Sequence, residues 1–335
     1  MTKSIAEALS PSAALQASGR DWGRIRWFEL AFWVVAIGAA FVLPSGFLLL
    51  NELAILILFA VSLDLVLGYA GIVSLGHAAF FGLGAYCAAL LAKHFGIDPI
   101  LGLLASASLA ALLGLLSSVL LVRGHDLTRL MVTMGVALLL YEVANKMHWL
   151  TGGADGLTGV TMEPLFGSIE FDIFGRTAYT YSICVLAILF LLARILVRSP
   201  FGMSLHVVRQ NPLRAAALGI HVNRRRATIY TIGAAYAGVA GALLAQTTGF
   251  ASLDVLDFHR SADVLLILVI GGTGYLYGGI IGAVVFKLMQ DWLASMTPQY
   301  WQFWIGLLLV VIVVVGHQKL IRPWTWFRKN QGGAA

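Results

Sequence analysis

Charged side chains are scarce in this chain of 335 residues. Asp, Glu, Lys and Arg make up only 11% of it, whereas 59% of the residues are hydrophobic. A typical soluble domain is roughly 25% charged, and a water-soluble core could not hide this much apolar surface. The same composition excludes a disordered, fibrous or nucleic-acid-binding protein. We therefore predict an all-α polytopic membrane protein.

Cysteine and enzymatic motifs are equally rare. Cys87 and Cys184 are the two cysteines, and both lie in apolar runs without the spacing of metal ligands. Neither a disulfide framework nor a zinc site is predicted. The sequence contains no HExxH, GxSxG or GxxxxGK[ST] motif, so we expect no cofactor in this chain and no catalytic residues. Without a phosphate-binding loop the chain is not expected to hydrolyse ATP itself.

Apolar runs separated by regular breaks predict about ten transmembrane or half-membrane helices. They lie at 28–47, 52–67, 78–94, 100–122, 130–149, 178–197, 227–247, 262–271, 278–294 and 301–317. A helix over 262–271 would rise only ~15 Å, so this run is either a half-helix or part of a re-entrant pair with 278–294. The predicted organisation is an N-terminal segment (1–27), a membrane domain (28–317) and a basic tail (318–335). No cleavable signal is expected, because a long mixed segment precedes the first run.

The distribution of positive charge predicts the orientation. If the chain crosses the membrane ten times, seventeen of its 22 Lys and Arg fall on one side. Such an excess marks the cytoplasmic side. We therefore expect both termini and the loop 198–226 in the cytoplasm, and the loop 150–177 on the outer side of the membrane. The net charge of +6 is then a topology signal, and no nucleic-acid partner is predicted.

Two glycine-rich stretches interrupt the apolar runs. We call residues 67–77 the first break and residues 271–279 the second break. Irregular backbone at membrane depth is tolerated only where it is buried in protein or lines a cavity. Short spans interrupted by glycine in both halves of a chain point to a transport site. The alternative is that the glycines only allow helices to cross closely, and the sequence leaves both interpretations open.

Polar residues in or beside the spans are candidates for a translocation pathway: Asp64, Ser74, His77, Glu142 and Thr273. A carboxylate at the centre of a membrane helix costs about 2.5–3.5 kcal/mol on insertion scales. Asp64 and Glu142 are therefore predicted to face the interior of the bundle. His77 could meet a solute, but a hydrogen bond between helices is the favoured interpretation.

The loop 198–226 has the pattern of a docking segment. Ala215–Leu218 followed by Gly219 predicts a short helix with a glycine stop, and arginines flank it. Topology requires only the charges, whereas a small-residue helix suits the groove of a partner. The candidate docking residues are Arg209, Asn211, Arg214, Ala215, Ala216, Leu218 and Gly219.

Several ordered motifs between about residues 50 and 290 are typical of one family. They are Leu67–Gly71 with Ser74–Tyr86, Leu150–Leu157, Ser199–Gly202, Ala217–Ile220 and Gly271–Gly274. The chain resembles the inner-membrane permeases of ABC importers for branched-chain amino acids, in particular the larger M-type subunit. The resemblance implies a second homologous permease subunit, two cytoplasmic ATPase subunits that bind ATP and Mg, and a periplasmic binding protein that delivers a small-molecule solute. It also implies that the loop 199–220 is the segment that couples to the ATPase.

The chain departs from the family pattern at a few positions. Asp64 stands where Asn is usual, Met203 and His206 where basic residues are common, and Pro212 where an acidic residue is common. Relatives that carry urea, amides or aromatic acids share much of the pattern, so these solutes remain alternatives. An ion-coupled secondary transporter would also use broken helices and buried carboxylates, but it would need no ATPase-docking helix.

Overall fold

The computed structural model describes residues 46–296, apart from 125, 166, 168 and 173, together with positions 33, 38, 300, 303, 304, 306 and 307. The chain divides into two compact units, residues 1–47 and 48–335, and nearly all the described residues belong to the second. The predicted segments 1–27 and 318–335 lie outside the described residues. So do almost all of the predicted spans 28–47 and 301–317.

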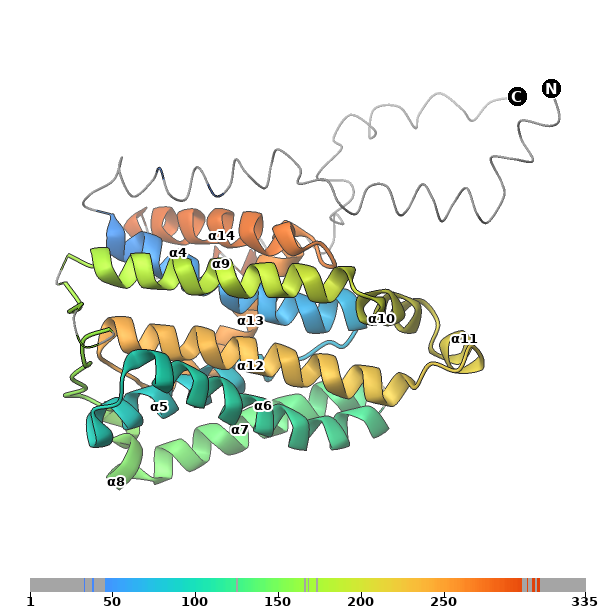
Figure 1. The fold of residues 1–335 in the computed structure, drawn as a ribbon, viewed down its shortest axis with the longest axis horizontal. Coiled ribbons are helices and arrows are strands. Elements are labelled where there is room, and N and C mark those ends of the chain that lie inside the picture. Colours follow the sequence, from blue (N-terminus) through green and yellow to red (C-terminus); the bar gives the residue numbers. More distant parts are fainter. Residues whose placement is uncertain are drawn as a thin grey trace. The chain divides into compact units, whose positions relative to one another are not determined.

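The described part of the second unit is built from helices (Figure 1). The long helices are α4 (Phe47–Asp64), α5 (His77–Phe95), α6 (Pro99–Arg123), α7 (Asp126–Lys146), α9 (Arg176–Arg198), α12 (Val222–Thr248) and α14 (Leu276–Met296). A π turn (Leu65–Tyr69) prolongs α4. The shorter elements are α8 (His148–Thr151), α10 (Pro200–Gln210), α11 (Pro212–Ala217), α13 (Phe258–Gly271) and two 3-10 turns (Gly153–Asp155 and Leu253–Leu256).

Within the described residues, seven helices are long and apolar enough to cross a membrane. Each predicted span between residues 52 and 294 coincides with a helix, so the all-helical prediction is confirmed there. The predicted total of ten and the side on which the termini lie remain predictions. At 14 residues, α13 rises about 21 Å and is shorter than the ~30 Å hydrocarbon core, as expected of a half-helix.

The core forms where α12 packs against α5 and α6 (Figure 1). Glycine allows these helices to touch through their backbones. A Cβ on Gly84 would lie 2.1 Å from the carbonyl oxygen of Gly238, and one on Gly241 would lie 1.8 Å from that of Phe81. No side chain fits into such contacts, so larger residues would force the helices apart. Close helix crossing therefore accounts for these glycines, which lie outside the two breaks.

The hairpin of α13 and α14 is joined in the same way. A Cβ on Gly271 would lie 1.8 Å from the carbonyl oxygen of Gly278, and one on Gly282 would lie 2.1 Å from that of Ile267. The two helices therefore contact each other through their backbones. Gly271 and Gly278 of the second break take part in this contact.

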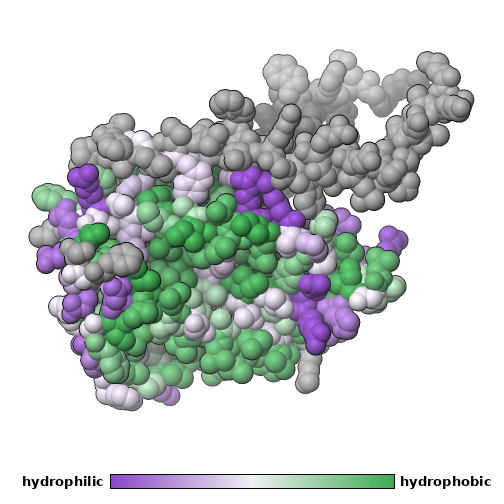
Figure 2. Space-filling model, in the orientation of Figure 1, coloured by the Kyte–Doolittle hydropathy of each residue, from purple (hydrophilic) through white to green (hydrophobic). Residues whose placement is uncertain are grey.

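The surface is apolar between two polar ends. Figure 2 shows a broad hydrophobic face with hydrophilic residues gathered at either end of the described helices. Large side chains such as Leu116 on α6 and Leu139 on α7 are exposed, which is expected of helix faces that meet lipid or another membrane subunit. In Figure 1, α10 and α11 lie at one end of the bundle and α8 at the other.

Candidate functional site

The two glycine breaks meet at the end of the bundle that carries α10. Asp64, the last residue of α4, is fully buried, and its Oδ1 accepts a hydrogen bond from the backbone nitrogen of Gly274, at 2.7 Å. A Cβ on Gly68 would lie 2.5 Å from the same nitrogen. Asp64 and Gly274 are 210 positions apart, so the fold brings together two segments that the sequence shows separately.

Arg209 adds a third segment to this contact. It lies near the end of α10, and its Nη1 donates a hydrogen bond to the carbonyl oxygen of Gly68. A Cβ on Gly71 would lie 3.1 Å from the Cγ of Arg209, and one on Gly274 would lie 2.7 Å from its Nη1. The arginine predicted to act in docking therefore also touches both breaks.

The local backbone explains why the first break is irregular. The π turn after Asp64 ends at Tyr69, and Gly71 then takes a φ of +70°, a conformation that residues with a Cβ adopt only at a cost. The chain continues without helical structure to His77, where α5 begins. The π turn and the positive φ of Gly71 therefore end the helix before α5 begins.

His77 forms a hydrogen bond between two helices. Its Nε2 lies 2.9 Å from the Oγ of Ser62 on α4, and its ring stacks on Phe59 with the centroids 5.7 Å apart. His77 and Ser74 are both fully buried. The favoured interpretation of His77 as a link between helices is therefore confirmed, while a role for either residue in translocation stays a prediction.

The other two pathway candidates lie elsewhere. Glu142 is exposed on α7, so the expectation that it faces the interior of this bundle is wrong. The buried residues of this helix include Ala137 and Ala144, which occupy a different face from that of Glu142. Thr273 is exposed in the turn between α13 and α14. Of the predicted pathway residues, Asp64 contacts the second break directly, and Thr273 precedes its partner Gly274 in the chain.

The predicted docking loop contains two helices where one was expected. The Oγ of Ser199 caps α10 by accepting a hydrogen bond from the nitrogen of Gly202, at 3.4 Å. The Oδ1 of Asn211 caps α11 by accepting one from the nitrogen of Arg214, at 3.1 Å. Gly219 has a φ of +80°, which confirms the predicted glycine stop. Asn211 therefore has a structural role that its place among the docking candidates did not anticipate.

Exposure separates the docking candidates. Ala215 is fully buried and cannot belong to a docking surface, so the expectation that it contacts a partner is wrong. Leu218 is 74% exposed, and so is Leu213 at 83%, a residue the sequence analysis missed. The only sequence feature that could have indicated Leu213 is its position between a proline and an arginine. A groove of about 650 Å³ lies here, lined in part by Pro212, Leu213, Ala216, Ile220, His221 and Arg224.

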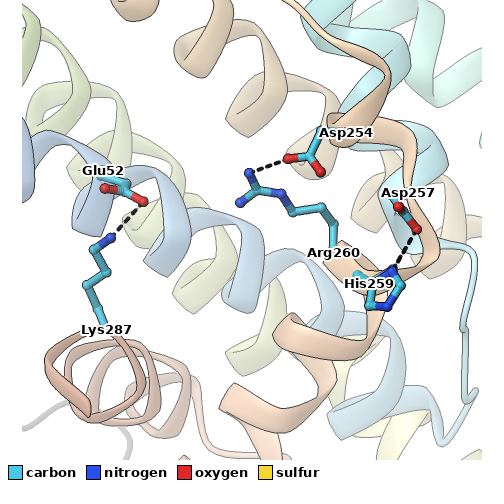
Figure 3. A network of polar contacts seen from close by, with 6 residues as sticks. All are labelled: Glu52, Asp254, Asp257, His259, Arg260 and Lys287. Carbon is cyan, nitrogen blue, oxygen red and sulfur yellow. Dashed lines mark hydrogen bonds and ion pairs between the residues drawn. The ribbon is translucent and has the colours of Figure 1, made fainter. Parts of the chain in front are cut away.

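Ion pairs join α14 to α4, and α13 to the turn that precedes it (Figure 3). Lys287 on α14 is 7% exposed, and its Nζ lies 2.9 Å from Oε1 of Glu52 and 3.2 Å from Oδ1 of Asp291. Lys287 is therefore buried between two carboxylates that are themselves about half exposed. Arg260, at the start of α13, pairs with Asp254, at 3.0 Å.

Asp257 caps α13 from the loop that precedes it. Its Oδ1 accepts hydrogen bonds from the backbone nitrogen of His259, at 3.1 Å, and from the ring of the same residue. Partial burial raises the pKa of Asp257, but these hydrogen bonds outweigh it, so its pKa falls below the ordinary value of 3.8. Among the residues that the structure describes, no group of three or more His, Cys, Asp and Glu could hold a metal ion.

Comparison with known proteins identifies the family. Residues 46–313 match the family described as branched-chain amino acid transport system / permease component, which is most of the chain. The chain belongs to this family. Its members of similar sequence include the high-affinity branched-chain amino acid transport system permease protein LivM of Escherichia coli, 28% identical over 99% of this chain and 83% of the relative. LivM of Salmonella typhimurium is 28% identical over 95% of this chain and 80% of the relative.

A further similar protein is named for a sugar. The fructose import permease protein FrcC of Rhizobium meliloti is 25% identical over 90% of this chain and 83% of the relative. No solved structure matches the chain. Family and helices together make the chain a multi-pass membrane protein and an ABC-type permease, with both breaks and the loop 198–226 inside the matched region.

Proposed function

We propose that the chain is the membrane-spanning permease of an ATP-driven importer in a bacterial inner membrane. It translocates branched-chain or related amino acids that a periplasmic binding protein delivers. A second, homologous permease subunit completes the pathway, and two cytoplasmic ATPase subunits bind ATP and Mg and drive the cycle. The chain supplies no catalytic residue of its own.

The exposed leucines of the basic loop carry this proposal. Leu213 and Leu218 are 83% and 74% exposed, beside the charged residues Arg214 and Arg224. Lipid does not account for apolar side chains placed among arginines at a polar end of the molecule, and an apolar patch rimmed by polar residues marks a site of protein association. The groove beside Leu213 and Ala216 gives such a partner a shape to fill. An ATPase subunit is the partner that a permease of this family needs.

The proposed solute rests on the relatives. The two LivM proteins match a larger share of this chain than FrcC does, and at higher identity. A sugar is the competing solute, because FrcC is named for fructose import. Urea, amides and aromatic acids are further alternatives. We place delivery at the end of the bundle that carries α8 and the loop between α12 and α13, opposite the docking helices.

Disruption of the docking surface tests the ATPase association. Leu213→Asp and Ala216→Glu should leave permease abundance in the membrane unchanged, while co-purification of the ATPase subunits and uptake of radiolabelled leucine fall together. Gln210→Asp is the matched control, since Gln210 is exposed on α10 and lies outside the residues that line the groove. Retention of both association and uptake in the two variants would refute the docking proposal. An ion-coupled secondary transporter would then become the better interpretation.

The solute and the energy source need a separate measurement. In vesicles that hold the whole complex, leucine uptake should require ATP inside and the binding protein outside. Unlabelled isoleucine and valine should compete with it, and fructose and urea should not. Uptake that follows a proton or sodium gradient without ATP would contradict the proposed importer, and competition by fructose alone would contradict the amino acid assignment.

A further inference from the structure

One side chain joins the cytoplasmic helices to both glycine breaks. The Nη1 of Arg209 donates a hydrogen bond to the carbonyl oxygen of Gly68. The same atom lies 2.7 Å from the place that a Cβ of Gly274 would occupy, and the Cγ of Arg209 lies 3.1 Å from that of Gly71. The guanidinium therefore occupies the point where the first break, the second break and α10 come together.

The glycines around Arg209 make this approach possible. A Cβ at Gly274 would crowd the Nη1 of Arg209, one at Gly71 would press on its Cγ, and one at Gly68 would lie 2.1 Å from the Oδ1 of Asp64. Backbone without side chains thus surrounds the guanidinium on both sides. Asp64 holds the second break through its hydrogen bond with Gly274, and its carboxylate attracts Arg209 across the contact.

Arginine suits this position better than lysine would. Its planar guanidinium presents several donors in a fixed fork and stays charged, whereas the lysine ammonium is a compact, strongly hydrated point charge on a flexible stem. A hydrogen bond from a charged donor is also stronger than a neutral one. Because Arg209 lies near the end of α10 and Asn211 caps the next helix, any displacement of α10 and α11 moves the guanidinium directly.

We propose that Arg209 is a positioning residue that transmits the movement of α10 to the two glycine breaks. While α10 stays in its present place, Arg209 keeps the breaks together at the cytoplasmic end of the bundle. Displacement of α10 by a docked partner withdraws the guanidinium and lets the breaks separate. This inference rests on the proposed docking of ATPase subunits at α10 and α11, although the contact itself can be tested without them.

The first experiment reports on the breaks in the permease alone. Ser74 is fully buried in the first break, so Ser74→Cys provides a thiol of similar size, in a background that carries Cys87→Ser and Cys184→Ser. Inside-out membrane vesicles are treated with a membrane-impermeant maleimide. Arg209→Gln should raise the labelling rate about tenfold or more, the scale expected for a lost hydrogen bond from a charged group. Arg209→Lys should give an intermediate rate.

A matched control separates position from charge. Arg214→Gln removes the same charge from the neighbouring helix α11, and Arg214 is exposed and makes no contact of the kind that Arg209 makes with Gly68. Its labelling rate should equal that of the parent. Equal rates for Arg209→Gln and the parent, at equal membrane abundance, would overturn the proposal. A rate raised as much by Arg214→Gln would also overturn it, because the effect would then be one of charge in the loop.

The second experiment measures coupling in the purified complex. Arg209→Gln should retain the ATPase subunits at the parent yield but import at least about tenfold less solute per ATP hydrolysed, with partial recovery in Arg209→Lys. Loss of the ATPase subunits from Arg209→Gln would overturn the proposal by making Arg209 a docking residue. A parent complex that imports nothing with ATP would instead refute the proposed function, and the labelling experiment would still decide the role of Arg209.

Discussion

The carboxylate of Asp64 accepts a hydrogen bond from the backbone nitrogen of Gly274, and the two atoms lie 2.7 Å apart. This bond needs an acceptor and does not by itself need a charge. The other carboxylate oxygen of Asp64, Oδ2, has no hydrogen-bond partner among the described residues. The bond therefore predicts different outcomes for Asp64→Asn, which keeps an acceptor for Gly274, and Asp64→Leu, which removes it.

Asp64→Asn should preserve folding and most uptake, because the amide oxygen can accept the same bond and Asn fits the same space. Asp64→Leu should reduce both, since it leaves the partly buried N–H of Gly274 without its acceptor, at a cost of about 1–3 kcal/mol. Uptake at matched membrane abundance measures the difference. A large loss of uptake in Asp64→Asn, with normal abundance, would show that the charge itself is required.

Substitution of two glycines with similar backbone angles distinguishes the cost of steric crowding from the cost of backbone strain. Gly274 has a φ of +81° and Gly219 a φ of +80°, so an alanine at either position pays a similar conformational cost, roughly 1–2 kcal/mol. Only at Gly274 would the new Cβ also press on Arg209 and on the backbone of Gly68, since no described atom lies within 4 Å at Gly219. Gly274→Ala should therefore lower the melting temperature in detergent more than Gly219→Ala. Equal shifts would mean that crowding at this contact is relieved cheaply.

The buried lysine of α14 should be less replaceable than its partner on α4. Lys287→Gln removes the cation that Glu52 and Asp291 share; their side chains are 50% and 45% exposed, so the loss of the two ion pairs together should cost about 1–2 kcal/mol. Glu52→Gln leaves Lys287 paired with Asp291 at 3.2 Å, and the side chain of Glu52 is 50% exposed, so its loss should cost about 1 kcal/mol or less. Thermal unfolding of the purified protein compares the two. The reverse order of melting temperatures would contradict this assignment.

Cysteine labelling tests the predicted orientation. Thr161 is exposed in the loop between α8 and α9, and Gln210 is exposed at the end of α10. In a background without Cys87 and Cys184, an impermeant maleimide added to intact cells whose outer membrane admits it should label Thr161→Cys. It should label Gln210→Cys only after the inner membrane is opened. Labelling of position 210 in intact cells would invert the topology, and with it the proposed side of ATPase docking.

The sequence allowed the membrane helices to be predicted where apolar residues are continuous, as in α6 and α12. It failed where helical backbone continues into water. The span predicted from residue 227 begins at Val222 in the structure, because Arg224 and its neighbours are good helix formers that a hydropathy window rejects. For the same reason the mixed composition of α10 predicts a loop there, whereas the structure has a helix.

The site was predictable only in pieces. The glycine clusters and Asp64 could be recognised from the sequence, because both are unusual at membrane depth. Their meeting could not, since the bond from Gly274 to Asp64 joins segments that local patterns treat as independent. Glu142 shows the opposite error: the cost of a carboxylate in lipid favours a buried position, yet α7 places it on the surface.

The backbone contact between α13 and α14 has a mechanical consequence. Gly271 and Gly278 leave no gap between the two helices, and neither do Gly282 and Ile267. The hairpin can therefore tilt or shift as a unit, but α13 and α14 cannot separate from each other without losing these backbone contacts. Its tip carries Gly274, which Asp64 holds from one side. Displacement of that tip would therefore move α13 and α14 together as one rigid unit. The ion pair between Lys287 and Glu52 links this unit to α4.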